Sequence, residues 1–474
     1  MGEHSYKRHL KTMLVVLVVF FVFTQSIAQK KSYNPGEKYT PIQLKEDFGV
    51  FREKLEINLA NLYLYNQKIR LDFVFDSLFN AIDHPMTDME FYAFLTPINS
   101  IIKDGHNYIY PDPVVTHYFN QTCKFIPYHI LWINNKLVVD KQCTPDSSII
   151  VGSEILKING LDAKYIFNEL LRRQVRDGYN ETYPIWNLNH YFREYYSYIF
   201  GHPETFTITY KTNDEAIKTV MVDALTKENM MCYLGSTLYP DLKKEKGVDY
   251  QFDESIETGY LKVRSFDRVM FHKKFHQNYA REIRKAFFEI KQDNIETLVL
   301  DLRNNQGGNF EYGQYLLSYL LKEPFHLIEQ TKAVNGFAKK RLRKGVCYGT
   351  KLTKIKRNAY HGKLYVLING GCFSNCGIVV SDLSYYNRGI LIGEETGGNK
   401  SILSGNVGFE TVTVLPNTSI HCDPVNHQIQ VNSKIENDGH GTMPNYWITP
   451  SLSDIINKND IVKNFVYKMI MEGN

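Results

Sequence analysis

The sequence predicts a multidomain α/β protein with a helical N-terminal part, a β-rich middle part and an α/β core at the C-terminus. Three observations support this prediction. Helical periodicity fills residues 40–103, alternating strand patterns dominate residues 120–215, and apolar strands alternate with helical patterns from residue 257 onward. With 474 residues the chain is too long for one hydrophobic core, so two or three domains are expected.

The first 28 residues are typical of a targeting segment. A basic stretch around Lys7 precedes an unbroken apolar run at 13–23, which is too short to cross a bilayer comfortably. Residues 26–28, Ser-Ile-Ala, then fit a small-x-small cleavage site. We therefore expect residues 1–28 to be a signal peptide, with an uncleaved N-terminal anchor as the alternative. Either way the protein is expected to be exported, to the periplasm or the extracellular space.

The net charge and the hydropathy of the chain argue against nucleic acid and membrane as binding partners. The formal net charge of +4 gives no reason to expect nucleic acid or anionic lipid as a partner. No later run approaches the roughly 18 apolar residues of a membrane helix. We therefore expect no stable membrane span once the signal peptide is cleaved, and the oligomeric state stays open.

Residues 29–119 are predicted to form an N-terminal helical domain. A capping box at Thr87–Glu90 opens one of its helices, and Pro97 is expected to kink that helix. The domain ends in the sequence DGHN at 104–107, before an alternating strand. A lone histidine is more often structural than catalytic, so His106 needs further support. The apolar positions of the first helix are Leu44, Phe48, Phe51, Leu55, Leu59 and Leu62.

Residues 120–215 are predicted to form a β-rich domain. A hairpin is expected between Cys123 and Cys143, whose thiols either pair across it or stay unpaired and buried. A strand and a helix follow within 152–172, and then an insertion at 173–202 that is rich in Tyr, Trp and Asn. The charged segment 216–256 is predicted to be an irregular linker, and residues 257–474 form the last domain.

The turn around Ser374 carries the sharpest local signal. An apolar run, Leu364–Asn369, ends at two glycines, and Ser374 follows where the pattern becomes helical. Ser374 is thus expected at a helix N-terminus, where unpaired N–H groups suit an oxyanion. The alternative is an ordinary serine N-cap. Cys372 and Cys376 bracket Ser374, either as packing residues or as a local disulfide.

A second stretch, Thr297–Phe310, reads TLVLDLRNNQGGNF: a buried strand, a polar turn and then two glycines. Together with the Ser374 turn and the sequence GEETGG at 393–398, it resembles peptidase family S41, the C-terminal processing and tricorn-core type of serine protease. The three motifs occur in that family's order and cover most of the C-terminal domain. The resemblance implies a ClpP/crotonase-like α/β catalytic core for residues 257–474.

The resemblance also implies roles for the matching residues. Ser374 corresponds to the nucleophile of the family. Gly307, Gly308 and Asn375 correspond to the residues whose backbone N–H groups form its oxyanion hole. DGHN resembles the D-x-H motif of the tricorn- and CPAF-like branch, in which the histidine is the general base. His106 is therefore the expected base, because a neutral imidazole can accept the serine proton near pH 7.

The acid and a competing base come from two later segments. Glu436 is the nearest match to the acid of the Ser-His branch, with Asp438 as its competitor, and its task is to hold the imidazole tautomer. In the Ser-Lys branch the base is a lysine. That position is held here by Asn399, and Lys400 lies one place later. We therefore favour a serine–histidine–acid triad over a serine–lysine dyad.

These residues lead to one expected function and two alternatives. The segment 152–172 resembles the strand and following helix of a PDZ domain, a module that binds an extended peptide as an added strand, although it can also be purely structural. We expect an exported serine endopeptidase that acts on unfolded or extended polypeptides without a cofactor. The alternatives are a non-catalytic ligand- or peptide-binding protein on the same fold, and a Ser–Lys protease that uses Lys400. No metal site is expected, because His272 and His276 lack the glutamate of an HExxH motif.

Overall fold

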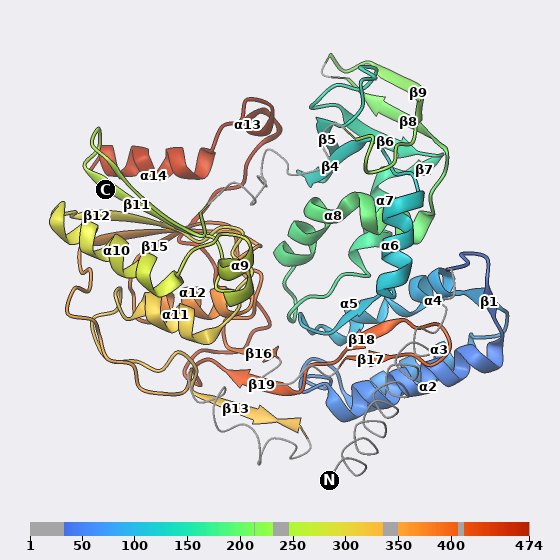
Figure 1. Cartoon of the computed structure of the whole chain (residues 1–474), viewed down its shortest axis with the longest axis horizontal. Coiled ribbons are helices and arrows are strands. Elements are labelled where there is room, and N and C mark those ends of the chain that lie inside the picture. Colours follow the sequence, from blue (N-terminus) through green and yellow to red (C-terminus); the bar gives the residue numbers. More distant parts are fainter. Residues whose placement is uncertain (1–32, 213, 231–245, 335–348, 406–411, 474) are drawn as a thin grey trace, which may run out of the picture. The chain divides into compact units, whose positions relative to one another are not determined.

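The computed structural model of the chain (Figure 1) describes residues 33–212, 214–230, 246–334, 349–405 and 412–473. The expected signal peptide at 1–28 lies outside these residues. The chain divides into two compact units, Met1–Glu37 and Lys38–Asn474, and all helices and strands given below lie in the second. None of the described helices combines the length and the apolar composition that a bilayer crossing requires.

The N-terminal part of this unit is helical, as the periodicity predicts. Capping boxes at Thr40 and Thr87 satisfy the first backbone N–H groups of two of its helices. Pro97 separates α4 from α5, which confirms the expected break. Helix α5 ends at Lys103, whose left-handed φ of 62° turns the chain into the loop that carries His106. The helices are α2 (Pro41–Asn58), α3 (Lys68–Asn80), α4 (Asp88–Leu95), α5 (Ile98–Ile102) and α6 (Pro113–Thr122).

The middle part is an antiparallel sheet in the order β4–β5–β6–β8–β9, with a short β7 paired to β6. Asn134 and Asn135, both with positive φ, form the tight turn of the predicted β4–β5 hairpin. Helices α7 and α8 share one apolar cluster with this sheet, and the insertion at 173–202 is mostly α8. The elements are β4 (Tyr128–Ile133), β5 (Lys136–Gln142), β6 (Glu154–Ile158), β7 (Leu161–Asp162), α7 (Ala163–Leu171), α8 (Thr182–Phe200), β8 (Thr205–Lys211) and β9 (Ile217–Asp223).

The C-terminal part is built on a six-stranded sheet in the order β10–β11–β12–β14–β15–β20. All neighbouring pairs from β11 to β20 are parallel, and β10 adds an antiparallel edge. The predicted alternation of strands and helices therefore gives the expected partly parallel sheet. The strands are β10 (Val248–Asp253), β11 (Thr258–Val263), β12 (Thr297–Asp301), β14 (Lys363–Ile368), β15 (Ile390–Gly393) and β20 (Tyr446–Trp447).

Helices cover both faces of this sheet (Figure 1). Leu298 and Leu300 of β12 pack into one apolar cluster with α10 and α12, while Val299 between them packs into another with α14. Burial on both faces explains why these strands read as continuous apolar runs in the sequence. The helices are α9 (Arg268–Lys273), α10 (Tyr279–Gln292), α11 (Phe310–Leu317), α12 (Asn375–Tyr385), α13 (Leu452–Ile456) and α14 (Ile461–Met471).

Small antiparallel sheets join segments that are distant in the sequence. Strand β3 begins two residues after His106 and pairs with β18 from the C-terminal part, so it ties the His106 loop to that part. The three sheets are β3 (Tyr108–Tyr110) with β18 (His421–Asp423) and β17 (Thr413–Val414); β13 (Gln330–Ala333) with β19 (His427–Gln430) and β16 (Ile402–Gly405); and β1 (Lys38–Tyr39) with β2 (Met86–Thr87).

Several expectations need correction. The segment 216–256 contains β9 and β10, so it is not an irregular linker throughout. Neither alternative for the hairpin cysteines is correct, because Cys123 is a free, half-buried thiol while Cys143 is disulfide-bonded. Cys372 and Cys376 are free and buried, so they are packing residues. Helix α3 was not predicted, and its N-cap residue makes no side-chain capping bond that would mark a start in the sequence.

Candidate active site

Ser374 lies at the turn between β14 and α12, beyond the carboxyl end of a central parallel strand. Its φ of 54° and ψ of −127° are costly for a residue with a side chain, so the turn holds it in a strained conformation. It occupies the N-cap position, but its half-buried hydroxyl makes no capping hydrogen bond. The ordinary N-cap role therefore does not account for Ser374.

Asparagine side chains build the turn that presents Ser374. The Asn369 side-chain oxygen accepts hydrogen bonds from the N–H groups of Gly371, at 3.1 Å, and Asn304, at 2.9 Å. The backbone oxygen of Asn305 accepts a bond from the N–H of Phe373, at 3.1 Å. The turns that follow β12 and β14 are thus fastened together at the edge where parallel sheets usually place their sites.

The predicted glycines pack directly against the nucleophile turn. A Cβ atom on Gly307 would lie 2.6 Å from the backbone oxygen of Phe373 and 2.7 Å from the nitrogen of Asn375, so only glycine fits there. The N–H of Gly307 already donates to the Asn305 side chain at 2.9 Å. Within the described part of the chain, the N–H groups of Gly308 and Asn375 have no acceptor. These two donors are the ones left for a developing oxyanion.

His106 reaches the same place from the N-terminal part. Its ring stacks on that of Phe373, the residue before Ser374, with 4.6 Å between centroids. Phe373 stacks in turn on Tyr183 of α8, at 3.9 Å. Burial lowers the pKa of His106 to about 4, so the imidazole is neutral at pH 7 and can accept a proton. Its Nδ1 is buried without a hydrogen-bond partner.

Two buried carboxyl groups face His106. One ligand-type atom each from Asp104, His106 and Asp177 lie within 4.8 Å of one another. Asp104 accepts hydrogen bonds from the Ser404 hydroxyl and the His106 N–H, and its second oxygen has no partner. Asp177 accepts from the N–H groups of Gly105, at 2.8 Å, and Asn399, at 3.1 Å.

Burial shifts the pKa values of this cluster toward the neutral forms of its members. Burial and the neighbouring Asp104 raise the pKa of Asp177 to about 7, and burial raises the pKa of Asp104. Among the described residues, these three side chains are the one group of His, Cys, Asp and Glu that could hold a metal ion. Both oxygens of Asp177 already accept hydrogen bonds from backbone N–H groups, which a cation would have to displace. We therefore interpret the group as an acid–base cluster.

Comparison with known proteins places the core in a family. Residues 257–421 match the family model described as peptidase family S41. This segment is an S41 peptidase domain. The chain is 28% identical over 172 residues to carboxyl-terminal-processing peptidase 3 of Arabidopsis thaliana, a chloroplastic protein; the match covers 35% of this chain and 29% of that relative.

Solved structures share the fold well beyond the S41 domain. The crystal structure of mature CPAF has a TM-score of 0.64 at 15% identity and covers 92% of this chain and 98% of its own. The structure of mature CPAF complexed with lactacystin gives the same TM-score, identity and coverage of this chain, and 99% coverage of its own. At this identity the likeness establishes the fold. The mixed α/β architecture is therefore shared over most of the length of both chains.

The other candidates of the S41 domain make no contact with His106 in the described part of the chain. Lys400 forms an ion pair with Asp438, at 2.6 Å from Nζ to the carboxylate. Glu436 is exposed, and no hydrogen bond or ion pair joins it to His106 in the described part of the chain. His272 and His276 lie on and just after α9, in another part of the fold. Of the predicted residues, the structure thus brings together the nucleophile turn, the glycines and His106.

Sequence reasoning missed the residues that support these groups. Asp104 lay inside the DGHN motif but received no role, although its spacing from His106 was visible. Asp177, Tyr183 and Phe373 gave no signal of their own, because their partners are distant in the sequence. Asp177 and Tyr183 come from the 173–202 insertion, whose richness in Tyr, Trp and Asn indicates no particular role.

Proposed function

We propose that this protein is an exported serine endopeptidase that hydrolyses peptide bonds in unfolded or extended polypeptides. Ser374 is the nucleophile and His106 its general base. The N–H groups of Gly308 and Asn375 stabilise the oxyanion, and Gly307 allows the two turns to approach. The match of residues 257–421 to peptidase family S41 supports this proposal, because the members of that family are serine-type peptidases.

One observation carries the proposal. The ring of His106, from the N-terminal part of the chain, stacks on that of Phe373, from the C-terminal part. Phe373 directly precedes the strained Ser374. A stack between a histidine and a phenylalanine alone would be ordinary packing. Here it holds the neutral imidazole against the residue that precedes Ser374, whose hydroxyl makes no capping bond and whose turn carries an unpaired N–H donor. That combination of parts is what acyl transfer requires.

The acid of the triad is Asp104 or Asp177 in this proposal, and Glu436 is the weaker candidate. An acid that holds the imidazole tautomer must reach a ring nitrogen. One carboxyl oxygen each of Asp104 and Asp177 lies within 4.8 Å of a His106 ring nitrogen, so either group could form this bond after a small movement. Glu436 would need its loop to move inward, because its side chain is exposed.

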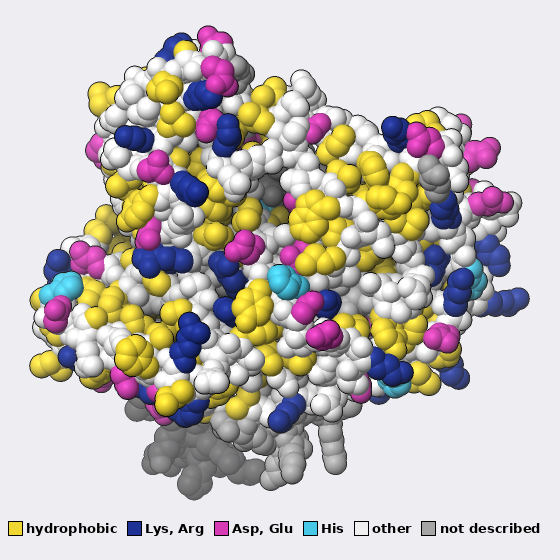
Figure 2. Space-filling view, turned by 180° about the vertical axis from the view of Figure 1, so that it is seen from behind, with side chains coloured by type: hydrophobic (Ala, Val, Ile, Leu, Met, Phe, Trp, Pro, Cys, Tyr) yellow, Lys and Arg dark blue, Asp and Glu magenta, His cyan; other side chains and the backbone are white. Residues whose placement is uncertain are grey.

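The proposed domain roles follow the expected architecture. Residues 29–119 form a helical domain that supplies the base. Residues 120–215, extended to include β9, form a PDZ-like domain, and residues 257–474, preceded by β10, form a ClpP/crotonase-like catalytic domain. Strand β9 is the last strand of the middle sheet, so it offers an edge for an extended peptide. Figure 2 shows basic and acidic side chains interspersed on one face, which suits polypeptide better than nucleic acid as a partner.

Export is supported by two independent features. Residues 1–28 have the pattern of a signal peptide. Cys143 is disulfide-bonded, and disulfides persist mainly in oxidising compartments such as the periplasm or the extracellular space. A protein that stayed in a reducing cytosol would gain little from this bond.

A second candidate is a latent protease or a non-catalytic binding protein. The observation that favours it is that no hydrogen bond joins Ser374 to His106 in the described part of the chain. Catalytic hydrogen bonds often tighten only when substrate binds, so this does not exclude activity. A carrier would bind a ligand on the same fold and would be indifferent to the loss of the serine hydroxyl.

A fluorophosphonate probe on purified protein distinguishes these possibilities. We expect labelling at Ser374, digestion of casein in the presence of EDTA, and loss of both in Ser374→Ala. Ser384→Ala, at the far end of α12, is the matched control and should keep both. Labelling that survives Ser374→Ala would disprove the nucleophile. A wild-type protein that is neither labelled nor active at any pH would favour the binding protein.

A further inference from the structure

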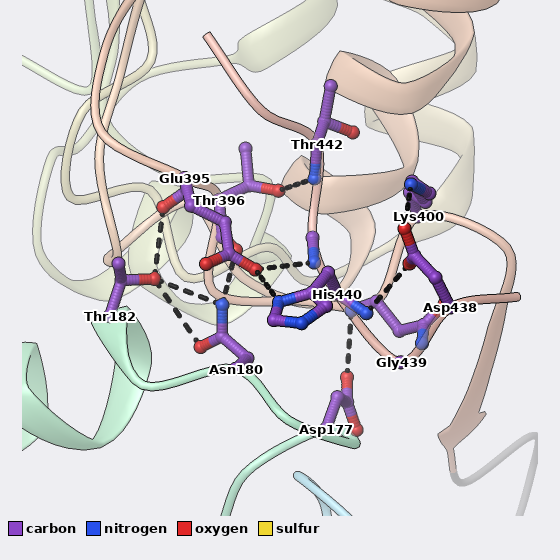
Figure 3. A network of polar contacts seen from close by, with 12 residues as sticks. Asp177, Asn180, Thr182, Glu395, Thr396, Lys400, Asp438, Gly439, His440 and Thr442 are labelled. Carbon is purple, nitrogen blue, oxygen red and sulfur yellow. Dashed lines mark hydrogen bonds and ion pairs between the residues drawn. The ribbon is translucent and has the colours of Figure 1, made fainter. Parts of the chain in front are cut away.

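Residues 177–180 form a strap across the active site, although they belong to neither the helical domain nor the catalytic domain. The Gly178 N–H donates to the backbone oxygen of Lys103, at 3.0 Å, and the Tyr179 N–H to that of Gly439, at 2.8 Å. The Asn180 side chain donates to the backbone oxygen of Thr396, at 3.0 Å. Figure 3 shows Asp177 and Asn180 pointing from this segment toward the loop that carries Thr396 and Lys400.

Asp177 makes the two contacts of the strap that matter most for chemistry. One carboxylate oxygen accepts the N–H of Gly105, the residue before the proposed base. The other accepts the N–H of Asn399. The preceding residue, Gly398, packs behind the nucleophile, since a Cβ on it would lie 3.1 Å from the Ser374 nitrogen. One buried carboxylate thus spans the loop of the base and the loop behind the nucleophile.

We propose that Asp177 is a positioning residue which, in its ionised form, ties the loop of the base to the loop behind the nucleophile. This inference rests on the proposed peptidase function and goes beyond it, because it assigns the control of the base to the strap. Both oxygens must act as acceptors, and only the carboxylate form offers two without carrying a proton. A protonated Asp177 would have to turn an O–H toward one of two N–H donors, which loosens that contact.

Burial and the neighbouring Asp104 make ionisation of the Asp177 carboxyl group unfavourable near neutral pH. Asp177 is 3% exposed, and the titratable groups that face it are Asp104, His106 and Tyr108 from the loop and strand after α5, and Tyr65 from the loop before α3. Burial and Asp104 raise the pKa of Asp177 to about 7. The clamped form is therefore lost as the pH falls through neutrality, well before His106 is protonated.

The central test is the pH profile of Asp177→Asn. In the wild type, kcat/KM should fall below about pH 7 as Asp177 is protonated. In Asp177→Asn, kcat should drop about tenfold or more at pH 8, with KM changed less than about threefold, because a lost positioning bond acts mainly on the chemical step. The fall near pH 7 should disappear. Glu181→Gln, an exposed carboxyl change four residues away, is the control and should keep the wild-type profile.

A second variant protects the test against misfolding of the first. A Cβ on Gly105 would lie 2.6 Å from an Asp177 oxygen, so Gly105→Ala should break the contact between the two residues. The carboxyl group of Asp177 is still present in this variant. Gly105→Ala should lower kcat in the same way while keeping a titration near pH 7. The proposal is overturned if Asp177→Asn keeps the wild-type midpoint, or if Gly105→Ala keeps full kcat.

Thermal unfolding separates this inference from the proposed function. The folded pKa of Asp177 is raised above its unfolded value, so the folded protein binds more protons between about pH 4 and 7 and loses stability as the pH rises through that window. Asp177→Asn should reduce this loss whether or not the protein is a peptidase. If the wild type has no peptidase activity but its unfolding shows the pH dependence due to Asp177, the proposed function is wrong and the role of Asp177 as a clamp still holds. An active enzyme without that pH dependence would sink the clamp alone.

Discussion

Replacing the proposed base and its rival by alanine gives the sharpest comparison. His106 is held against Phe373, the residue before Ser374, and burial keeps its imidazole neutral at pH 7. Without a base the hydroxyl is a weak nucleophile and only oxyanion stabilisation remains. His106→Ala should therefore lower kcat/KM by a factor on the order of 10³ or more, which corresponds to about 4 kcal/mol in the activation barrier.

Lys400→Ala should have a much smaller effect. Its ammonium is paired with Asp438, whose side chain is 44% exposed, and such pairs contribute only about 0–1 kcal/mol to stability. A side chain engaged in an ion pair with Asp438 is not free to act as the base for Ser374, so we expect a change in kcat/KM of less than about fivefold.

The assay is steady-state hydrolysis of a fluorogenic peptide and of casein, with circular dichroism to confirm folding of each variant. Loss of the His106 stack should cost only about 0.5–1.5 kcal/mol of stability, so the variant should remain folded. The reverse ranking, with Lys400→Ala inactive and His106→Ala active, would refute the triad and restore the Ser–Lys dyad.

Two further predictions follow from the same contacts. Gly307→Ala should lower kcat by about 10²-fold or more, because its Cβ would push the Phe373 and Asn375 backbone apart and misplace the oxyanion donors; wild-type kcat in a folded variant would contradict this. The lowered pKa of His106 means that only the unfolded chain binds its proton between about pH 4 and 6.5, so stability falls as the pH drops through that window. Chemical denaturation of wild type and His106→Ala should show a weaker acid dependence in the variant, and equal slopes would argue against a buried neutral imidazole.

Local patterns in the sequence were enough to predict the core and the nucleophile turn. The strands β12, β14 and β15 are short apolar runs followed by turns that contain glycines, and such runs are set by burial on both faces of a parallel sheet. The capping box at Thr87 and the break at Pro97 are likewise decided by neighbouring residues. His106 could be singled out because its motif lies at a recognisable place, after the N-terminal helices.

Only the tertiary structure decided how those parts are completed. The sequence offered Glu436 as the acid from its position before Gly441, whereas the fold turns that side chain outward and buries Asp104 and Asp177 beside His106. The fold also places Lys400 in an ion pair with Asp438. The N–H of Gly307 donates to the Asn305 side chain, which leaves the N–H groups of Gly308 and Asn375 as oxyanion donors. The physical reason is that periodicity and capping act over a few residues. Which carboxyl group faces an imidazole, by contrast, depends on loops that meet only when the whole chain has folded.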